Sequence, residues 1–499
     1  MVNILVDKDY FAYISCDDKS LFSLIKRSFT RKISKYNNWL KRYEEREVKH
    51  YTLFNKGKQI KVKAGLIPFL TASFDSRGIE YNVRDNRERL DLKTKNIVTK
   101  FSNGMLLRPY QEEAARLALA ENYCCIQLPT GAGKTNVAAS IIKTYLESYY
   151  RRAVVYVVPT IRLQTEAKER FESYGIKTST TKDFILGVAN IVTYTTLVRS
   201  EISTEVKNRV GAILWDECHH LKANKASKII HQYKKLNLCV GLSATVVADI
   251  EYKKQLNRLA DQDFSVFGCT GLPVYYKPID ETIEEKYITP IKINVVENRE
   301  QIKLTSEELA DWHVIKRKVL MSKNRANLIA ALTKQLVEQN NLNTVCLLIP
   351  EVLWSKQYMV ILSQYFEFNK DVRIILMYGQ DKYDEIIDGK IRNLVTDEEK
   401  KEAMQAIKDP NTKTVFSATS FLYEGIDITN MQAIVNVYGG RSTTRVKQQA
   451  GRVCRLFKDK NMAYIYEIYD DCPVLLSQLK ARLKIYKSEY NAEVVDYKF

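Results

Sequence analysis

Short apolar runs rich in valine, isoleucine and leucine recur along most of the chain, with stretches of helical spacing between them. Such runs are typical of strands buried on both faces of a parallel sheet, because helical connections cover both faces. We expect strands at Cys124–Leu128, Val154–Val158, Ile191–Tyr194, Ala212–Trp215 and Val240–Leu242, and again at Thr344–Ile349, Ile374–Met377, Thr414–Ser417, Ala433–Val437 and Ala463–Ile468. Two sets of five predict an α/β chain with two tandem parallel-sheet domains, joined near residues 275–288.

The first hundred residues show a different, mixed pattern. It predicts strands at Tyr10–Cys16, Val48–Phe54, Gln59–Val62 and Ile79–Val83, and helices at Asp18–Thr30 and Leu66–Asp75. The middle two strands should form a hairpin that turns at Asn55-Lys56-Gly57. The charged stretch Arg84–Lys100 contains few apolar residues and predicts a linker. We therefore expect a small α/β domain over residues 1–90, followed by domains over residues 91–280 and 281–499.

Positive charge is concentrated in the small N-terminal domain. The 499 residues carry a net charge of +18, and residues 1–100, with 22 basic and 12 acidic side chains, supply ten of those charges. Aromatic residues, among them Trp39 and Tyr43, lie between the basic ones. This mixture suits phosphate contacts combined with base stacking, and it equally suits a solvated basic face over an ordinary aromatic core.

Cysteine usage and hydropathy exclude several classes of protein. The nine cysteines form no Cys-x-x-Cys pair, which argues against a zinc site or a disulfide framework. No apolar run is long enough to span a membrane and the N-terminus does not resemble a signal peptide, so we expect a cytoplasmic protein with no membrane partner. A C-terminal helix from Pro473 carries Leu475, Leu476, Leu479, Leu483, Tyr486 and Tyr490 on one face, which either packs on the second sheet domain or binds a partner.

The stretch Leu128-Pro129-Thr130-Gly131-Ala132-Gly133-Lys134-Thr135 joins a predicted buried strand to a predicted helix. A Gly-rich turn that opens a helix with Gly-Lys-Thr cradles phosphates through backbone N–H groups and the positive helix N-terminus. Lys134 should reach the β- and γ-phosphates of a nucleotide, and Thr135 should ligate Mg²⁺. Leu128 stands where the strict motif has its first glycine.

Two carboxylates, Asp216 and Glu217, follow the predicted strand Ala212–Trp215. Open α/β sheets bind ligands at the carboxyl ends of their strands. The first carboxylate can hold Mg²⁺ through water, and the second can orient and deprotonate the attacking water. We therefore expect Asp216 and Glu217 to be catalytic together with Lys134.

The motifs resemble those of superfamily 2 helicases in kind and in order. Asp216-Glu217-Cys218-His219 resembles motif II, and further likenesses are Leu107–Gln111 (Q motif), Val158–Thr160 (Ia), Val192–Leu197 (Ib), Ser243–Thr245 (III), Ala418-Thr419 with Glu424–Asp427 (V) and Gln448–Arg455 (VI). The resemblance implies RecA-like domains. It also implies ATP contacts at Arg108, Gln111, Thr130, Gly131, Gly133, Gly425, Asp427 and Gln448, catalytic arginines at Arg452 and Arg455, coupling through His219, Ser243 and Thr245, and DNA contacts at Pro159, Thr160, Thr195, Thr196 and Thr419.

The chain resembles, more narrowly, the phage UvsW-type branch-migration helicases. The basic N-terminal domain, the Asp-Glu-Cys-His box and Ser322-Lys323-Asn324-Arg325 at a helix start carry this likeness. It implies an ATP-dependent DNA helicase that acts on forks, displacement loops and Holliday junctions. We expect a duplex arm to contact Lys26, Arg27, Arg31, Lys32, Lys41 and Arg42, with Trp39 or Tyr43 at the junction. There are two alternatives: an RNA helicase, and a nucleic-acid-binding module without ATPase activity.

Overall fold

The structure is a computed structural model, and it describes residues 1–8, 10–37, 42–90, 97–222, 229–245, 259–366, 371–378, 382–419 and 428–498. These residues divide into two compact units. One consists of residues 1–128 and 133–277, and the other of residues 129–132 and 278–499. Within the described residues, we find no helix with the length and apolar character that a membrane crossing requires.

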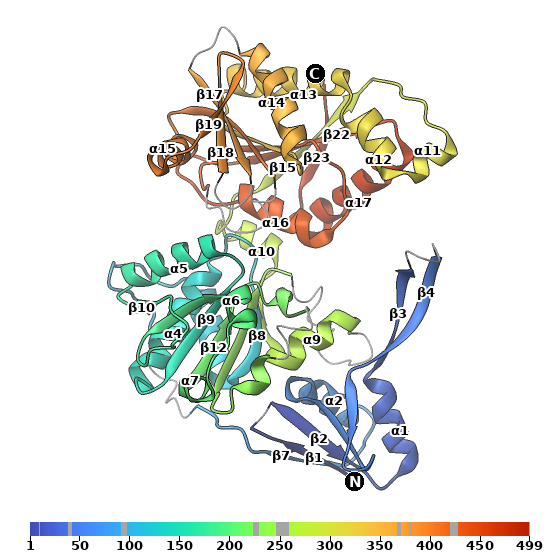
Figure 1. The fold of residues 1–499 in the computed structure, drawn as a ribbon, viewed down its shortest axis with the longest axis vertical. Coiled ribbons are helices and arrows are strands. Elements are labelled where there is room, and N and C mark those ends of the chain that lie inside the picture. The colour runs from blue at the N-terminus through green and yellow to red at the C-terminus, as the bar shows by residue number, and fades with distance from the viewer. Residues whose placement is uncertain are drawn as a thin grey trace. The chain divides into compact units, whose positions relative to one another are not determined.

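The first unit begins with a small α/β module, residues 1–90 (Figure 1). Its sheet has the order β5-β6-β2-β1-β7, in which only β7 runs parallel to its neighbour. The elements are β1 (Val2–Val6), β2 (Phe11–Ser15), α1 (Lys19–Ser28), β5 (Tyr51–Phe54), β6 (Gln59–Lys63), η1 (Ala64–Leu66), α2 (Ile67–Asp75) and β7 (Tyr81–Asp85). The β5–β6 hairpin is confirmed, with positive φ angles at all three residues of its turn, Asn55–Gly57.

A second hairpin, absent from the sequence-based expectation, projects from this module (Figure 1). Its strands are β3 (Thr30–Asn37) and β4 (Arg42–Lys49), and they pair only with each other within the described residues. The prediction of one continuous strand over Val48–Phe54 is therefore wrong. The strand is interrupted by a bend at His50, which separates β4 from β5. Polar and charged residues make up most of both strands, so the hairpin lacks the apolar alternation that marks a half-buried strand.

The remainder of the first unit is a RecA-like α/β domain. Its described strands form one parallel sheet in the order β10-β11-β9-β12-β13-β8-β14. They are β8 (Tyr123–Gln127), β9 (Ala153–Val158), β10 (Thr178–Ser179), β11 (Ala189–Thr193), β12 (Val210–Trp215), β13 (Leu238–Ser243) and β14 (Leu272–Tyr276). The helices are α3 (Pro109–Glu121), α4 (Lys134–Ser148), α5 (Ile161–Ser173), α6 (Tyr194–Arg199), α7 (Thr204–Arg209) and α9 (Asp261–Thr270). The five predicted strands are confirmed, and the short β10 and β14 extend the sheet at its edges.

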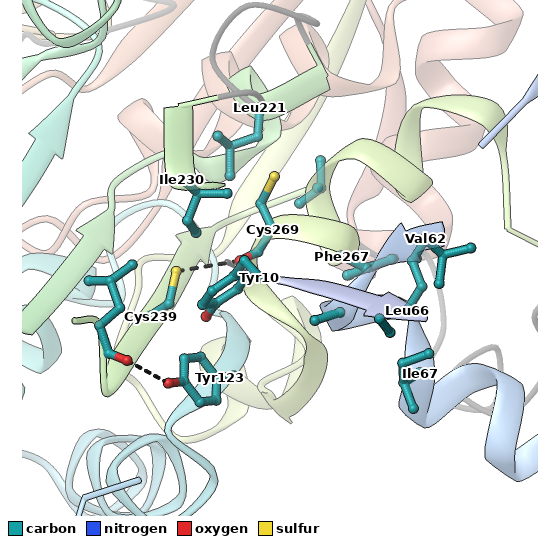
Figure 2. Close-up of a cluster of buried hydrophobic side chains, with 14 of the residues drawn as sticks. Tyr10, Val62, Leu66, Ile67, Tyr123, Leu221, Ile230, Cys239, Phe267 and Cys269 are labelled. Carbon is teal, nitrogen blue, oxygen red and sulfur yellow. Dashed lines mark hydrogen bonds between the residues drawn. The ribbon is translucent and has the colours of Figure 1, made fainter. Parts of the chain in front are cut away.

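One hydrophobic core joins the N-terminal module to this RecA-like domain (Figure 2). Tyr10 of the module packs edge-on against Tyr123 of β8, with ring centroids 5.1 Å apart. Phe69 of α2 lies 5.3 Å from Phe267 of α9. A side chain at Gly65 would come within 2.0 Å of the Phe267 carbonyl oxygen, so only glycine permits this close approach.

The prediction of a linker over Arg84–Lys100 is wrong for the first part of this stretch. Arg87 is ion-paired with Asp85, and its guanidinium lies 4.1 Å from the centre of the Tyr123 ring. The Tyr123 hydroxyl donates to the carbonyl of Glu88. Residues 85–90 therefore pack on the RecA-like domain; residues 91–96 lie outside the described part.

The second unit holds another RecA-like sheet. Its described strands have the order β19-β18-β17-β20-β16-β21-β22-β15-β23, in which β18 and β19 are antiparallel to their neighbours and all other pairs are parallel. The strands are β15 (Ile291–Asn298), β16 (Thr344–Leu348), β17 (Val372–Tyr378), β18 (Lys382–Ile387), β19 (Lys390–Leu394), β20 (Lys413–Ala418), β21 (Ala433–Asn436), β22 (Ala463–Asp470) and β23 (Glu493–Tyr497). The helices are α10 (Ile279–Glu284), α11 (Ser306–Ala310), α12 (Trp312–Ile315), α13 (Lys323–Glu338), α14 (Val352–Tyr365), α15 (Asp397–Lys408), α16 (Thr443–Val453) and α17 (Pro473–Tyr490). The predicted fold class, a small basic α/β domain followed by two RecA-like parallel sheets, is confirmed.

The C-terminal helix α17 packs against the second sheet. Arg482 and Tyr486 both bond to Glu467 of β22, at 2.6–3.0 Å and 2.9 Å. Glu467 is fully buried, so its charge depends on the paired guanidinium. Of the two alternatives for this helix, packing on its own domain is the one that the structure displays.

Candidate active site

The glycine-rich loop follows β8 and leads into α4. Gly133, the N-cap of α4, has φ 81°, which a residue with a side chain adopts only with strain. A Cβ at this position would also lie 2.4 Å from Nε2 of Gln111. The Oε1 of Gln111 accepts a hydrogen bond from the Arg108 N–H at 3.0 Å. The loop and the predicted Q-motif residues are thus in contact within the first unit.

Lys134, the first residue of α4, reaches the acidic pair at the end of β12. Its Nζ lies 3.3 Å from Oε1 of Glu217, and both side chains are largely buried. The backbone N–H of Asp216 donates to the Val157 carbonyl, which continues the ladder between β12 and β9. Glu217 itself has φ 46°, a conformation that a residue with a side chain rarely adopts.

Two side chains, those of His219 and Ser243, contact the other oxygen of Glu217. His219 Nδ1 lies 3.2 Å from Oε2, and the Ser243 hydroxyl lies 3.3 Å from the same atom. His219 Nδ1 and Ser243 Oγ are 3.0 Å apart, and Ser243 Oγ accepts a bond from the Thr245 N–H at 3.2 Å. The structure therefore brings together all three residues predicted to couple the motifs, with Glu217 at their centre.

The two carboxylates differ in their electrostatic surroundings. Burial, and then the charge of Glu217, raise the pKa of Asp216 to about 6. Burial also acts to raise the pKa of Glu217, but Lys134 and His219 outweigh it and hold that pKa below the ordinary value. Glu217 is thus the more acidic member of the pair and keeps its negative charge, as a base must.

Oxygen donors suited to Mg²⁺ lie at this site. Asp216 is buried beside a second carboxylate; burial first, and then the charge of Glu217, raise its pKa, and a bound cation would offset both effects. The hydroxyl of Thr135 follows Lys134 on α4 and is a hard oxygen ligand like the carboxylate. Among the described residues, no three His, Cys, Asp or Glu side chains form a cluster that could hold a metal ion by themselves. This donor set fits Mg²⁺, which is usually held by one or two protein oxygens, waters and substrate phosphates.

The predicted strand-contacting residues lie at the same edge of the sheet. Thr160 caps α5 directly after β9 and Pro159, and its hydroxyl accepts from the Leu163 N–H. Thr195 and Thr196 lie in the first turn of α6, which begins directly after β11, and Thr195 is exposed. Because β11, β9 and β12 are parallel neighbours, these residues share the carboxyl edge with Asp216.

The remaining predicted residues belong to the second unit or to the loop before Gly133. Gln448 and Arg452 lie on α16, Arg455 follows it, and Thr419 follows β20. Thr130 is buried and Gly131 has φ 87°. Gly425 and Asp427 lie outside the described residues.

Sequence reasoning missed Lys460, whose buried ammonium donates to the carbonyls of Thr429, Met431 and Val453 at 2.9–3.1 Å.

A basic hollow of about 340 Å³ lies between α1 and the start of the β3–β4 hairpin. It is lined by Ser23, Lys26, Arg27, Thr30, Lys32, Glu47, Lys49 and Tyr51. The structure thus gathers three of the six predicted phosphate contacts and adds Lys49 and Tyr51, which sequence reasoning did not select. Lys41 and Trp39, and the side chain of Arg42, lie outside the described part. Arg31 lies elsewhere, with its guanidinium 4.4 Å from the ring centre of Phe264 in α9.

Two family descriptions match the sequence. Residues 104–248 match the type III restriction enzyme res subunit, and residues 321–457 match the helicase conserved C-terminal domain. The chain is 27% identical over 389 residues to the DNA 3'-5' translocase XPB2 of Sulfurisphaera tokodaii, covering 72% of this chain and 80% of the relative. It is 21% identical over 384 residues to the ATP-dependent DNA helicase uvsW of Enterobacteria phage T4, covering 73% and 68%. A fragment of a putative HsdR subunit of a type I restriction enzyme from Vibrio vulnificus YJ016 has a similar fold, with TM-score 0.55, 15% identity and coverage of 96% and 82%.

Proposed function

Since the chain belongs to the superfamily 2 helicases and is an ATP-dependent enzyme of that kind, we propose that it is a DNA helicase or translocase that remodels branched DNA. Forks, displacement loops and Holliday junctions are the substrates that we assign to it. The N-terminal module would hold one duplex arm while the motor acts on a strand.

The chemistry that we assign to the first unit is hydrolysis of ATP. Lys134 and the loop N–H groups would bind the phosphates, Gln111 and Arg108 would contact the base, and Glu217 would deprotonate the attacking water. Thr135 and Asp216 would hold Mg²⁺, which neutralises phosphate charge when it is bound. The distances that support these roles are those from Glu217 to Lys134 and to His219.

The second unit would supply positive charge to the transition state. Arg452 and Arg455 stand at the spacing of the Gln-x-x-Gly-Arg-x-x-Arg motif, and guanidinium groups stabilise the charge that develops on the transferred phosphoryl group. Removal of the γ-phosphate would then change the state of the motor, as it does in other nucleotide-driven switches.

One observation carries the assignment to branched DNA, namely the basic hollow. Lys26, Arg27, Lys32 and Lys49 converge on it, and Arg27, Lys32 and Lys49 are exposed. A motor that contacts only the sugar-phosphate backbone of one strand does not distinguish branched from linear nucleic acid. A preference for branched DNA therefore requires a separate surface that binds a second duplex arm. The relatives named as a DNA translocase and a DNA helicase support DNA over RNA as the substrate.

The purified full chain provides the test of this function. ATP hydrolysis is measured without nucleic acid and with single-stranded DNA, linear duplex, forked DNA and RNA of equal length. We expect DNA to stimulate hydrolysis and forked DNA to be unwound faster than linear duplex with the same tail. Stimulation by RNA alone would identify an RNA helicase, and the absence of hydrolysis under every condition would leave a binding module.

A further inference from the structure

The base of the β3–β4 hairpin has two different faces. Thr30 pairs with Lys49 and Lys32 with Glu47, so these four residues point to one side, which lines the basic hollow. Arg31, between Thr30 and Lys32, points to the opposite side. The hairpin base therefore presents one face to the hollow and the other to α9.

The face toward α9 is clamped on the ring of Phe264. The Arg31 guanidinium lies 4.4 Å from the ring centre, and its Nε donates to the Leu259 carbonyl at 2.9 Å. His50, which follows β4, stacks on the same ring with centroids 4.3 Å apart and an angle of 17° between the planes. His50 Nε2 also lies 2.8 Å from Oδ1 of Asp261. Both ends of the hairpin, one before and one after its tip, are thus anchored at a single buried aromatic ring.

Helix α9 in turn packs on the segments that carry the catalytic residues. It contacts η2 (Cys218–Lys222), which begins directly after Glu217. At its far end, Thr270 Oγ1 lies 2.8 Å from the Sγ of Cys125, in the strand that leads to the phosphate loop. A side chain at Gly241 of β13 would come within 3.0 Å of Cys125, Cys218 and Thr270, so these elements meet without free space.

We propose that the clamp on Phe264 couples DNA held in the basic hollow to ATP hydrolysis. Phosphates that draw in Lys32 and Lys49 would pull on the hairpin base, and Arg31 and His50 would transmit the displacement to α9. Close-packed elements pass such a displacement on, because their interiors do not absorb it. The shift would reach η2 and change the position of Glu217. This coupling rests on the proposed function, in which the N-terminal module binds DNA.

The test replaces the clamp and leaves the DNA surface and the catalytic residues intact. Phe264→Leu keeps an apolar side chain in the core but removes the ring that Arg31 and His50 contact. The matched control is Phe69→Leu, which loses a buried ring from the same interface with α9, at Phe267, where the hairpin is not involved. For both variants, we measure the ratio of ATP turnover with saturating forked DNA to turnover without DNA. The affinity for forked DNA and the midpoint of thermal unfolding are measured alongside it.

We expect Phe264→Leu to lower this ratio by roughly 5-fold or more, the range of measured couplings between sites, with affinity and basal turnover within about 2-fold of wild type. Phe69→Leu should keep the wild-type ratio at a similar thermal midpoint. An equal ratio in the two variants, lowered or not, overturns the coupling. His50→Gln, which keeps a partner for Asp261 but loses the stacked ring, gives the same comparison if Phe264→Leu does not fold.

A variant with glutamine at Lys26, Arg27, Lys32 and Lys49 separates this inference from the proposed function. If it binds forked DNA as tightly as wild type does, the module holds no DNA, and the proposed function and the coupling both fail. If its binding is weakened while Phe264→Leu keeps the wild-type ratio, the proposed function stands and the coupling alone is refuted.

Discussion

Glu217→Gln is the substitution that most sharply tests the chemistry assigned to the active site. The change keeps the shape of the side chain, and its amide oxygen can still accept a bond from Lys134 or Ser243. It removes the negatively charged oxygen that would accept the proton of the attacking water. A positioned general base contributes about 10²–10⁴ in rate, which corresponds to roughly 2.7–5.4 kcal/mol in the activation free energy.

The same substitution should affect folding much less than catalysis. Lys134 loses a charged partner, which destabilises the site, but Asp216 loses the neighbouring charge that helps to raise its pKa, which offsets that cost. We expect ATP binding to persist, measured with a fluorescent nucleotide, while turnover falls by at least about 100-fold. The matched control is Glu88→Gln, which makes the same chemical change at an ion pair with Arg152 in the same unit. Turnover within a factor of ten of wild type in Glu217→Gln would refute the assignment of the base.

Further predictions concern the second unit and the clamp. In steady-state kinetics, Arg455→Ala should lower kcat by about 10³ with much less effect on nucleotide affinity. A loss of affinity with unchanged kcat would mean that this arginine binds the nucleotide in the ground state and does not stabilise the transition state. Burial lowers the pKa of His50, so below pH about 6.5 the unfolded chain binds a proton more readily than the folded chain does, and stability should fall with acid. His50→Gln should flatten that dependence in urea titrations between pH 7 and pH 5, and an unchanged slope would contradict the account. Ending the chain after Asp471 should make it insoluble or lower its melting temperature, because Glu467 loses Arg482 in a buried site; a stable, active truncation would favour the partner-binding alternative.

The strands that the sequence predicts well are those buried on both faces. The runs at β8 and β9 contain almost only apolar residues, because helices cover both sides of the sheet. The exposed hairpin β3–β4 has no such signature, since neither strand packs a full face on a core. The first strand, Val2–Val6, alternates between buried and exposed positions, but the exposed Leu5 obscures that alternation in the sequence.

The candidate site shows the same division. Strand ends and loop glycines placed Lys134, Asp216 and Glu217 at one edge of a sheet, since the topology of parallel sheets dictates where such residues meet. The clamp residues His50 and Phe264 lie more than two hundred positions apart. No local pattern brings them together, because their contact depends on how the N-terminal module packs on α9.

The most direct test of the central claim compares the unwinding of forked and linear duplex DNA by the hollow variant. That variant carries glutamine at Lys26, Arg27, Lys32 and Lys49, and its control carries glutamine at four exposed lysines elsewhere in the first unit, Lys56, Lys58, Lys177 and Lys182. We predict that the hollow variant loses fork unwinding, keeps hydrolysis stimulated by linear single strands, and binds forks with a salt dependence weaker by about one unit of slope per lost contact. The control should behave as wild type. Parallel loss of both activities in the hollow variant, or an equal loss of fork unwinding in the control, would contradict the claim that the basic hollow holds a duplex arm.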